Sequence, residues 1–413
     1  MLRRQKRGST KAGAAQVYPW SVTVKIKSHI HFTDMSSHVR VFAIALALAT
    51  VPTSACADRT TTSTALRAWT VSDVPLLEVN ADDSSGLIAI GAAAHVTRLP
   101  DGGVLVSDRG LHSLRFFGPD GRFVRSVGRQ GPGPGEFEYI RVANRCGDSL
   151  FVEDIVSRRV NVYALNGSLK RTLATTVFGG GTEAFSSACN LAGFFVHHAW
   201  NRFDPATRGR HRDQVAVWLT SPANRRIADL DSVGGPEFVG LGDGGGRALL
   251  GRTPHLAIGR LHAYVGSADG GLITVYNLDG SHAGVRQMPF AEVKTTEEDL
   301  ERAKRLDTLG QSATEQAQTR QGWTLDTPPS TLPGYDALIV DSADHLWVRR
   351  YPVAGDNNTE WIVFSPGGEL EARVSLPAVL TVHEIGQNHI AGIVLDPVTG
   401  EHAVQVLSLS RSP

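Results

Sequence analysis

Short segments of apolar or alternating residues, each preceded by a tight-turn sequence, recur along most of the chain. Val104–Asp108 follows the turn Asp101-Gly102-Gly103, and Leu150–Asp154 follows Gly147-Asp148. Half-buried strands of about four to eight residues show this alternation, and Asp-Gly or Gly-Gly pairs supply the positive φ that tight hairpins need. The pattern predicts an all-β protein built from antiparallel hairpins.

The same unit occurs six times. We expect the second strands of the successive units to begin near Val104, Leu150, Phe194, His262, Leu346 and Ile390. A unit of four short strands that repeats every ~40–45 residues is typical of a β-propeller blade. Two longer intervals in the middle of the chain contain insertions.

The two ends of the chain together complete the sixth unit. That unit stops after its third strand, near Ser408, while a strand-like segment, Ala68–Val79, precedes the first unit. An N-terminal strand in the missing place would close the ring and cover a free sheet edge. We therefore predict a six-bladed β-propeller of four-stranded antiparallel blades over residues 66–411, with one helical insertion between blades four and five.

Three segments resemble one group of propellers. They are Gly131–Phe137 between blades one and two, Leu346–Tyr351 in blade five, and Val382–Gly386 entering blade six. In these segments the chain resembles the NHL-type six-bladed propellers of bacteria, a group of secreted proteins and lipoproteins. The resemblance implies the fold but no particular activity, because one fold hosts many functions.

The first 56 residues have the features of an export signal. Residues 35–56 contain Arg40, an apolar run, Val41–Val51, too short to cross a membrane, and the small residues Thr53-Ser54-Ala55 before Cys56. Cleavage by a signal peptidase and lipidation of Cys56 are both open. We expect residues 1–34 to be a non-native or disordered extension, with a basic cytoplasmic tail as the alternative. With residues 57–65 as a linker, the protein would be exported, to the periplasm or the cell surface.

Charge and cysteine content narrow the classes of partner. The whole chain has 41 basic and 41 acidic residues, and the basic N-terminus leaves an acidic remainder, which argues against nucleic-acid binding. Cys146 and Cys189 each end an innermost strand of neighbouring blades, so we predict a disulfide between blades two and three, with two buried thiols as the alternative. No Cys or His spacing indicates a zinc site.

The long insertions are expected on one face of the propeller. Turns between first and second strands, and between third and fourth, are minimal. The opposite face would carry four longer segments, 128–138, 199–212, 234–247 and 291–333. In the last one, Thr295 and Glu298 form a predicted capping box for a helix that would end at Gly310. That helix would be a lid or a rim-packed support, and Gly244-Gly245-Gly246 would be a flexible link.

Polar residues near the ends of second strands are the candidate site on this face. They are Arg109, Glu153, Asp154, Arg158, His197, His198, Arg349, Arg350 and Tyr351. Arginines and carboxylates could bind an anionic or sugar-like ligand through paired hydrogen bonds. The alternative is that they form salt bridges between blades. On the first interpretation, replacing Arg349 would disturb ligand binding more than folding.

The predicted function is therefore ligand recognition at the loop-rich mouth of the central channel. We favour a monomeric, non-catalytic binding protein for a small molecule, a glycan or a protein. The alternatives are a metal-dependent hydrolase or lyase, lactonase-like or glycan-active, and a structural module of a surface complex. No cofactor is predicted. Calcium would need several converging oxygen ligands, and only Glu153 and Asp154 are candidates.

Overall fold

The computed structural model describes residues 66–80, 93–174, 183–200, 207–242, 245–309, 311–396, 398 and 401–411, which belong to one compact unit. The predictions for residues 1–65, including Cys56, and for Gly310 lie outside the described residues. Within these ranges, no helix is long and apolar enough to cross a membrane.

Six four-stranded antiparallel sheets follow one another along the chain, and each is one blade. Blade 1 comprises β3 (Ala93–Arg98), β4 (Val104–Asp108), β5 (Ser113–Phe117) and β6 (Phe123–Val127). Blade 2 comprises β7 (Ile140–Cys146), β8 (Ser149–Asp154), β9 (Arg159–Ala164) and β10 (Leu169–Ala174). Blade 3 comprises β11 (Glu183–Cys189), β12 (Phe195–Trp200), β14 (Gln214–Thr220) and β15 (Arg226–Gly234).

The second half of the chain continues the pattern. Blade 4 comprises β18 (His255–Ile258), β19 (His262–Gly266), β20 (Leu272–Asn277) and β21 (His282–Gln287). Blade 5 comprises β22 (Tyr335–Val340), β23 (Leu346–Arg350), β24 (Asn358–Phe364) and β25 (Leu370–Pro377). Blade 6 comprises β26 (Leu380–Ile385), β27 (His389–Leu395), β28 (His402–Ser410) and, from the start of the chain, β2 (Thr70–Asn80).

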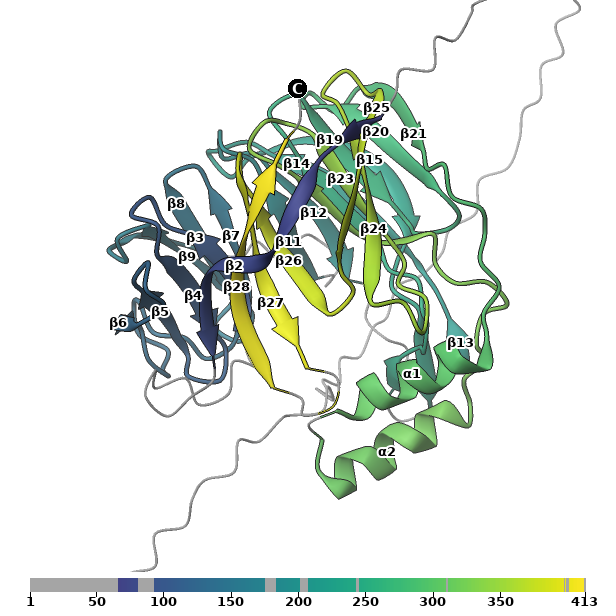
Figure 1. Ribbon diagram of the computed structural model, residues 1–413. Helices are drawn as coiled ribbons and strands as arrows, with labels where there is room; N and C mark the ends of the chain where they lie inside the picture. Colours follow the sequence, from purple (N-terminus) through teal and green to yellow (C-terminus); the bar gives the residue numbers. More distant parts are fainter. Residues whose placement is uncertain are drawn as a thin grey trace, which may run out of the picture. The chain divides into compact units, whose positions relative to one another are not determined.

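The blades close into a ring. The innermost strands β3, β7, β11, β18, β22 and β26 each contact the next in this order, and β26 contacts β3 again. The N-terminal strand β2 pairs with β28 as the outermost strand of blade 6, beside which it lies in Figure 1. A short strand before it, β1 (Arg67–Ala68), pairs with β25 of blade 5. The predicted six-bladed propeller and its N-terminal closing strand are confirmed.

Apolar contacts between neighbouring blades form the core. Six clusters of buried side chains each join two successive blades around the ring. At the junction of blades 5 and 6, for example, Trp347 and Trp361 pack in one cluster with Ile390 and Leu407. Burying side chains of this size contributes about 1.5–3 kcal/mol each, so adjacent blades stabilise one another.

A disulfide strengthens the junction of blades 2 and 3. Cys146, at the end of β7, is bonded to Cys189, at the end of β11, with a Cα–Cα distance of 5.6 Å. This is the pairing expected from the sequence. Among the described residues, the apolar cluster around it is small, with Phe151 and Phe195 in edge-to-face contact at 4.9 Å. The covalent bond therefore adds to a junction that buries few apolar side chains.

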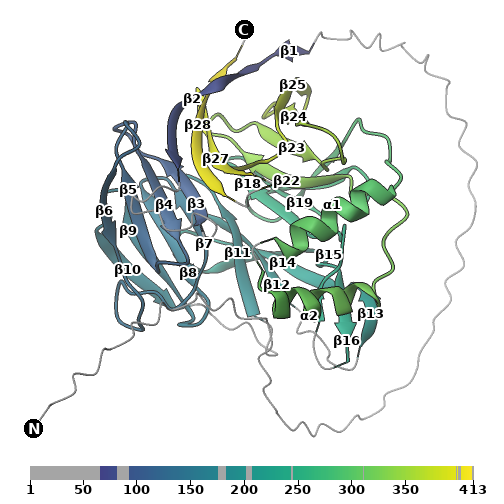
Figure 2. The ribbon, with the colours of Figure 1, turned by 60° about the horizontal axis from the view of Figure 1, so that its bottom comes forward.

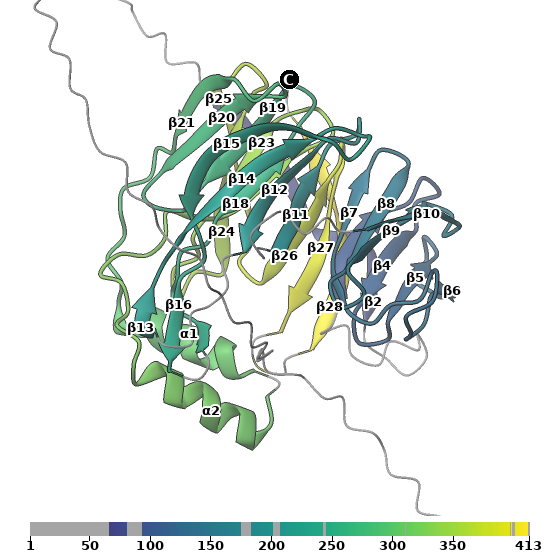
Figure 3. The same cartoon turned by 180° about the vertical axis from the view of Figure 1, so that it is seen from behind.

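The long insertions combine into one structure, here called the cap. It contains a three-stranded sheet of β13 (Arg208–His211), β16 (Phe238–Leu241) and β17 (Gly245–Arg247), and two helices, α1 (Glu297–Thr308) and α2 (Ala313–Trp323). Figures 2 and 3 show both helices beside β13 and β16, and α2 contacts β16 and β17. Insertions from three places in the sequence thus meet.

Two sequence expectations for the cap, the capping box and the glycine link, are corrected, and one helix was not predicted. The capping box of α1 pairs Thr296 with Asp299, one residue later than predicted. A second helix, capped by Ser312 and Glu315, follows in the same insertion. Gly245 and Gly246 lie in strand β17 and pair with β16, so this segment is not a flexible link.

Candidate functional site

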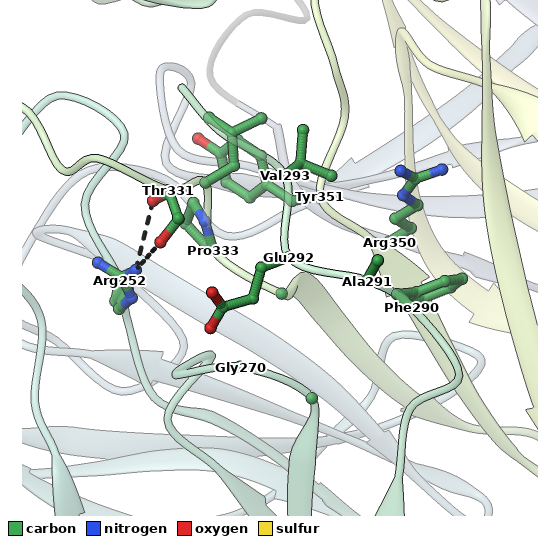
Figure 4. Close-up of a pocket in the computed structure, with 13 residues that line it drawn as sticks. Arg252, Gly270, Phe290, Ala291, Glu292, Val293, Thr331, Pro333, Arg350 and Tyr351 are labelled. Carbon is green, nitrogen blue, oxygen red and sulfur yellow. Dashed lines mark hydrogen bonds between the residues drawn. The ribbon is translucent and has the colours of Figure 1, made fainter. Parts of the chain in front are cut away.

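The cap lies on the face where second strands end, and a pocket opens between blades 4 and 5 on that face (Figure 4). The cavity has a volume of about 490 Å³, part of it open to solvent. Its walls come from the β19–β20 turn, the segments leading into and out of the cap helices, and the end of β23. Its polar side chains are those of Arg252, Glu292, Thr331, Arg350 and Tyr351.

Two charged side chains in this pocket have no ionic partner in the described part of the chain. The Arg350 guanidinium lies over the ring of Phe290, 5.5 Å from its centroid. Glu292 is exposed and accepts no hydrogen bond from a described residue. Burial, followed by the charge of Asp336, raises the pKa of the Tyr351 hydroxyl to about 12, so this group remains a hydrogen-bond donor. The pocket thus offers a cation, an anion and a hydroxyl.

A network of ion pairs fixes the pocket wall to the cap. Arg252 donates to the carbonyl and hydroxyl oxygens of Thr331, at 3.3 and 3.2 Å, and its Nε lies 3.2 Å from Asp269. Arg252 also lies 3.7 Å from Glu237. Glu237 in turn accepts from Arg210 of β13 at 2.6 Å. Because Arg252, Glu237 and Arg210 are each less than one fifth exposed and each has partners, their role is structural.

The floor of the pocket depends on a close backbone contact. A Cβ atom on Gly334 would lie 1.8 Å from the carbonyl oxygen of Gly270, so no other residue fits without moving the chain. Gly334 donates its N–H to Ala268. These contacts set the distance between the β19–β20 turn and the start of β22.

A second polar group lies on the first two strands of blade 5, β22 and β23. The pairing of β22 with β23 shifts between Tyr335 and Ala337, so Asp336 occupies a β-bulge, a feature that redirects a side chain. Its carboxylate lies 3.6 Å from Arg349 on β23. Burial raises the pKa of Asp336 to about 6, although Arg349 and Arg302 of α1 act in the opposite direction.

Blades 1, 3, 4 and 6 each contribute a histidine whose pKa is lowered by burial, so that its ring is uncharged at neutral pH. Burial, followed by Arg141, lowers the pKa of His198 to about 4, and burial, followed by Arg247, has the same effect on His255. His383 of blade 6, with its pKa lowered to about 4 by burial, stacks on His95 of blade 1. His383 also accepts a hydrogen bond from the Val96 amide at 3.0 Å, so this histidine pair links the first and last blades.

The sequence-predicted residues occupy the expected strand ends, but several are engaged in protein contacts. Arg109 donates to the carbonyl oxygens of Ile140 and Arg141, at 2.7 and 2.9 Å, and so links blades 1 and 2. Arg349 donates to Ala378 at 2.6 Å, which links blade 5 to the entry of blade 6. Arg158 is exposed, with a positive φ of 50°.

The two predicted carboxylates, Glu153 and Asp154, bond to groups within blade 2 or next to it. Asp154 is fully buried and accepts from the amides of Glu138, Tyr139 and Ser157 at 2.8–3.1 Å. Glu153 is paired with Arg141. Their oxygens are thus committed to protein donors, which does not suit them to hold calcium. No group of three or more potential metal-ligating side chains occurs among the described residues.

Sequence reasoning included Arg350 among the polar residues at the ends of second strands, but it missed Arg141, Asp336 and Glu292 as members of the site. Arg141 and Asp336 stand at β-bulges on innermost strands, and a bulge leaves no clear sequence signature. Glu292 and Arg350 line the same pocket because the segment leading into the cap helices lies beside the end of β23. The dipeptide Arg349-Arg350 was the signal that identified this strand end in the sequence.

Comparison with known proteins shows no family relationship. No family model matches the chain, and no curated protein matches it. Among solved structures, a member of the DUF4221 family from Bacteroides vulgatus is similar, with 9% identity over 83% of this chain and 99% of the other, at a TM-score of 0.47. A gluconolactonase from Xanthomonas campestris has 14% identity over 84% and 99%, at 0.41. A calcium-binding regucalcin from Agrobacterium tumefaciens has 10% identity over 77% and 90%, at 0.39. The assignment of the six-bladed fold therefore depends on the sheet topology itself.

Proposed function

We propose that this chain is an extracytoplasmic binding protein that recognises a small polar ligand in the pocket beneath the cap. The observation that carries this proposal is the pair of side chains without ionic partners, Arg350 and Glu292, in one cavity. A charged group is usually paired or solvated, and two of opposite sign in a preformed cavity suit a ligand with complementary polar groups.

The construction of the site supports this proposal. Insertions from three places in the chain build the cap, and a network of ion pairs holds the pocket wall. Binding residues are commonly carried by loops on a rigid scaffold. The disulfide Cys146–Cys189 supports export, because stable disulfides persist in oxidising compartments. Attachment through a lipid on Cys56 is part of the proposal.

The test is a binding screen with matched variants. Thermal shift and calorimetry would be run with amino acids, short peptides, organic acids and oligosaccharides. We expect a ligand whose affinity falls at least tenfold, about 1.4 kcal/mol, in both Arg350→Ala and Glu292→Ala. Arg122→Ala, at an exposed turn of blade 1, should leave affinity unchanged.

Two results would count against this site. A ligand that binds the two pocket variants as well as the wild type would place recognition elsewhere. The metal-dependent hydrolase or lyase is tested in the same screen. A stoichiometric bound metal, together with melting lowered by EDTA and restored by Ca²⁺, would favour that alternative over a binding protein.

A further inference from the structure

Blades 2 and 5 carry the same backbone feature with opposite charges. In blade 2 the bulged residue is Arg141, and its neighbour Val142 pairs with Glu153. In blade 5 the bulged residue is Asp336, and its neighbour Ala337 pairs with Arg349. Each bulge thus places a charged side chain next to an opposite charge on the second strand. The two blades are three positions apart in the ring of six.

The two ion pairs differ in how closely they approach. In blade 2, Arg141 Nε donates to Glu153 at 2.7 Å, and Nη2 donates to the same carboxylate. In blade 5, the nearest approach of Arg349 to Asp336 is 3.6 Å, which is too long for a hydrogen bond. The same kind of bulge therefore accompanies direct hydrogen bonds between Arg141 and Glu153, but none between Arg349 and Asp336.

The blade 5 pair has unused hydrogen-bonding capacity on both sides. No side chain of a described residue donates a hydrogen bond to the Asp336 carboxylate, and its Oδ1 is a buried acceptor without a partner. The Nε of Arg349 is a buried donor without a partner. Buried polar groups nearly always have a partner, so two such atoms in one ion pair need an explanation.

Part of each side chain in this pair is accessible to a ligand, although Asp336 Oδ1 and Arg349 Nε are themselves buried. The Asp336 side chain is 26% exposed, and that of Arg349 is 11% exposed. Arg302 of helix α1 lies close enough to act on the charge of Asp336 while donating to the Pro352 carbonyl at 3.1 Å. Tyr351, which lines the pocket beneath the cap, also senses the charge of Asp336. The blade 5 pair therefore adjoins the proposed binding pocket.

From these contacts we infer that Asp336 and Arg349 form a subsite for a hydroxyl group of an uncharged, hydroxyl-bearing ligand. A hydroxyl both donates and accepts a hydrogen bond. It can donate to the carboxylate of Asp336 while it accepts from the guanidinium of Arg349. An anion would be repelled by Asp336, and an ammonium group by Arg349 and Arg302. This inference rests on the proposed function and specifies the ligand class.

The test uses glycerol as the probe. Crystals of the full-length protein would be soaked in glycerol, in acetate and in methylammonium chloride, at the same concentration. We expect a glycerol hydroxyl within hydrogen-bond distance of both Asp336 and Arg349, and neither ion at that place. The Arg141–Glu153 pair in the same crystals is the internal control, because its direct hydrogen bonds leave no place for a hydroxyl.

A variant separates a specific subsite from general solvation. Asp336→Leu keeps the branched shape of the side chain and removes both oxygens, and Asp336→Asn, which keeps the size, removes only the charge. Glycerol should be lost from this place in Asp336→Leu while the fold is retained. Acetate on Arg349, methylammonium on Asp336, or no glycerol in the wild type would overturn the inference. A ligand that still binds at Arg350 and Glu292 in that case would leave the proposed function standing.

Discussion

The surroundings of Asp336 disfavour the charged form of its carboxylate. Its pKa rises from 3.8 to about 6 because burial outweighs the attraction of Arg349 and Arg302. The folded state therefore binds the proton more tightly than the unfolded state. The resulting stability is fully present below about pH 4 and is lost as the pH rises through 6. A position that costs stability at neutral pH is typical of a functional site.

This gives a prediction for Asp336→Asn. The shift corresponds to at most about 3 kcal/mol, and partial exposure reduces the expected gain in the variant to ~1–2 kcal/mol at pH 7.5. The gain should shrink as the pH falls toward 4. Chemical denaturation between pH 4.5 and 8 measures it, with Asp73→Asn, at an exposed position of β2, as the control. A gain that does not change with pH would contradict the shifted pKa.

At this scale the sequence predicted the type of residue better than its role. Arg349 was chosen because it ends a second strand, and it does lie beside the candidate subsite. Its hydrogen bond to Ala378 also makes it a link between blades, so Arg349→Ala should affect both stability and binding. Asp154 looked equally suitable, but its acceptor capacity is taken up by backbone amides that the sequence pattern does not indicate.

Among the elements, the cap depends on few apolar contacts and on a buried ion-pair network. Arg210 joins Asp326, after α2, to Glu237, before β16, with distances of 2.8 and 2.6 Å. The side chains of Asp326 and Glu237 are only 2% and 11% exposed. Removing the cation that pairs with a buried carboxylate strongly destabilises the folded state. One arginine therefore holds the helices against the small sheet.

Arg210→Ala should loosen the cap without unfolding the propeller. Removing one partner of a buried ion pair costs ~3–5 kcal/mol, which we expect as faster amide hydrogen exchange in α2 and β16. The central strands of the blades should keep their protection. The control is Arg122→Ala, whose ion pair with Asp120 is exposed and should change stability by less than ~0.5 kcal/mol. Equal loss of protection in cap and blades would show that the two unfold together.

The cap also contains elements that could not be predicted from the sequence. The first helix was predicted because a capping pattern is local, although the correct pair is Thr296 and Asp299. The three-stranded sheet was missed because its strands are short and come from two separate insertions. Their pairing is a long-range property, and Gly245 and Gly246 carry no strand signal of their own.

For the whole molecule, the repeat was enough to predict the blades and their closure. The predicted second strands begin within one residue of those observed, since turn residues mark each hairpin. The ends of the chain meet through Arg411, which lies over the ring of Trp69 and donates to Gly386 at 2.8 Å. Arg411 also pairs with the buried Asp341 at 2.8 Å. Closure thus combines strand pairing with an ion pair between blades 5 and 6.

The position of the N-terminal strand β1 predicts how the propeller would be oriented if the chain were anchored to a membrane. Arg67 of β1 pairs with Ala372, near the start of β25 and close to the short Ser365–Glu369 turn. The candidate site lies at the opposite face, where β23 ends. If residues 57–65 form the linker predicted from the sequence, they can extend by at most ~30–35 Å. A chain anchored through Cys56 should therefore hold its short turns toward the membrane and its mouth away from it.

This orientation can be measured with two labelled positions. A fluorophore at Ser281→Cys, on a short turn of blade 4, should be quenched strongly by lipids that carry a quencher in reconstituted vesicles. The same label at Asn357→Cys, in the loop after β23, should be quenched weakly, because it lies on the mouth face. Cys56→Ser should abolish both signals by releasing the protein. Stronger quenching at position 357 would mean that the mouth faces the membrane, and a membrane-bound ligand would then replace a soluble one in the proposed function.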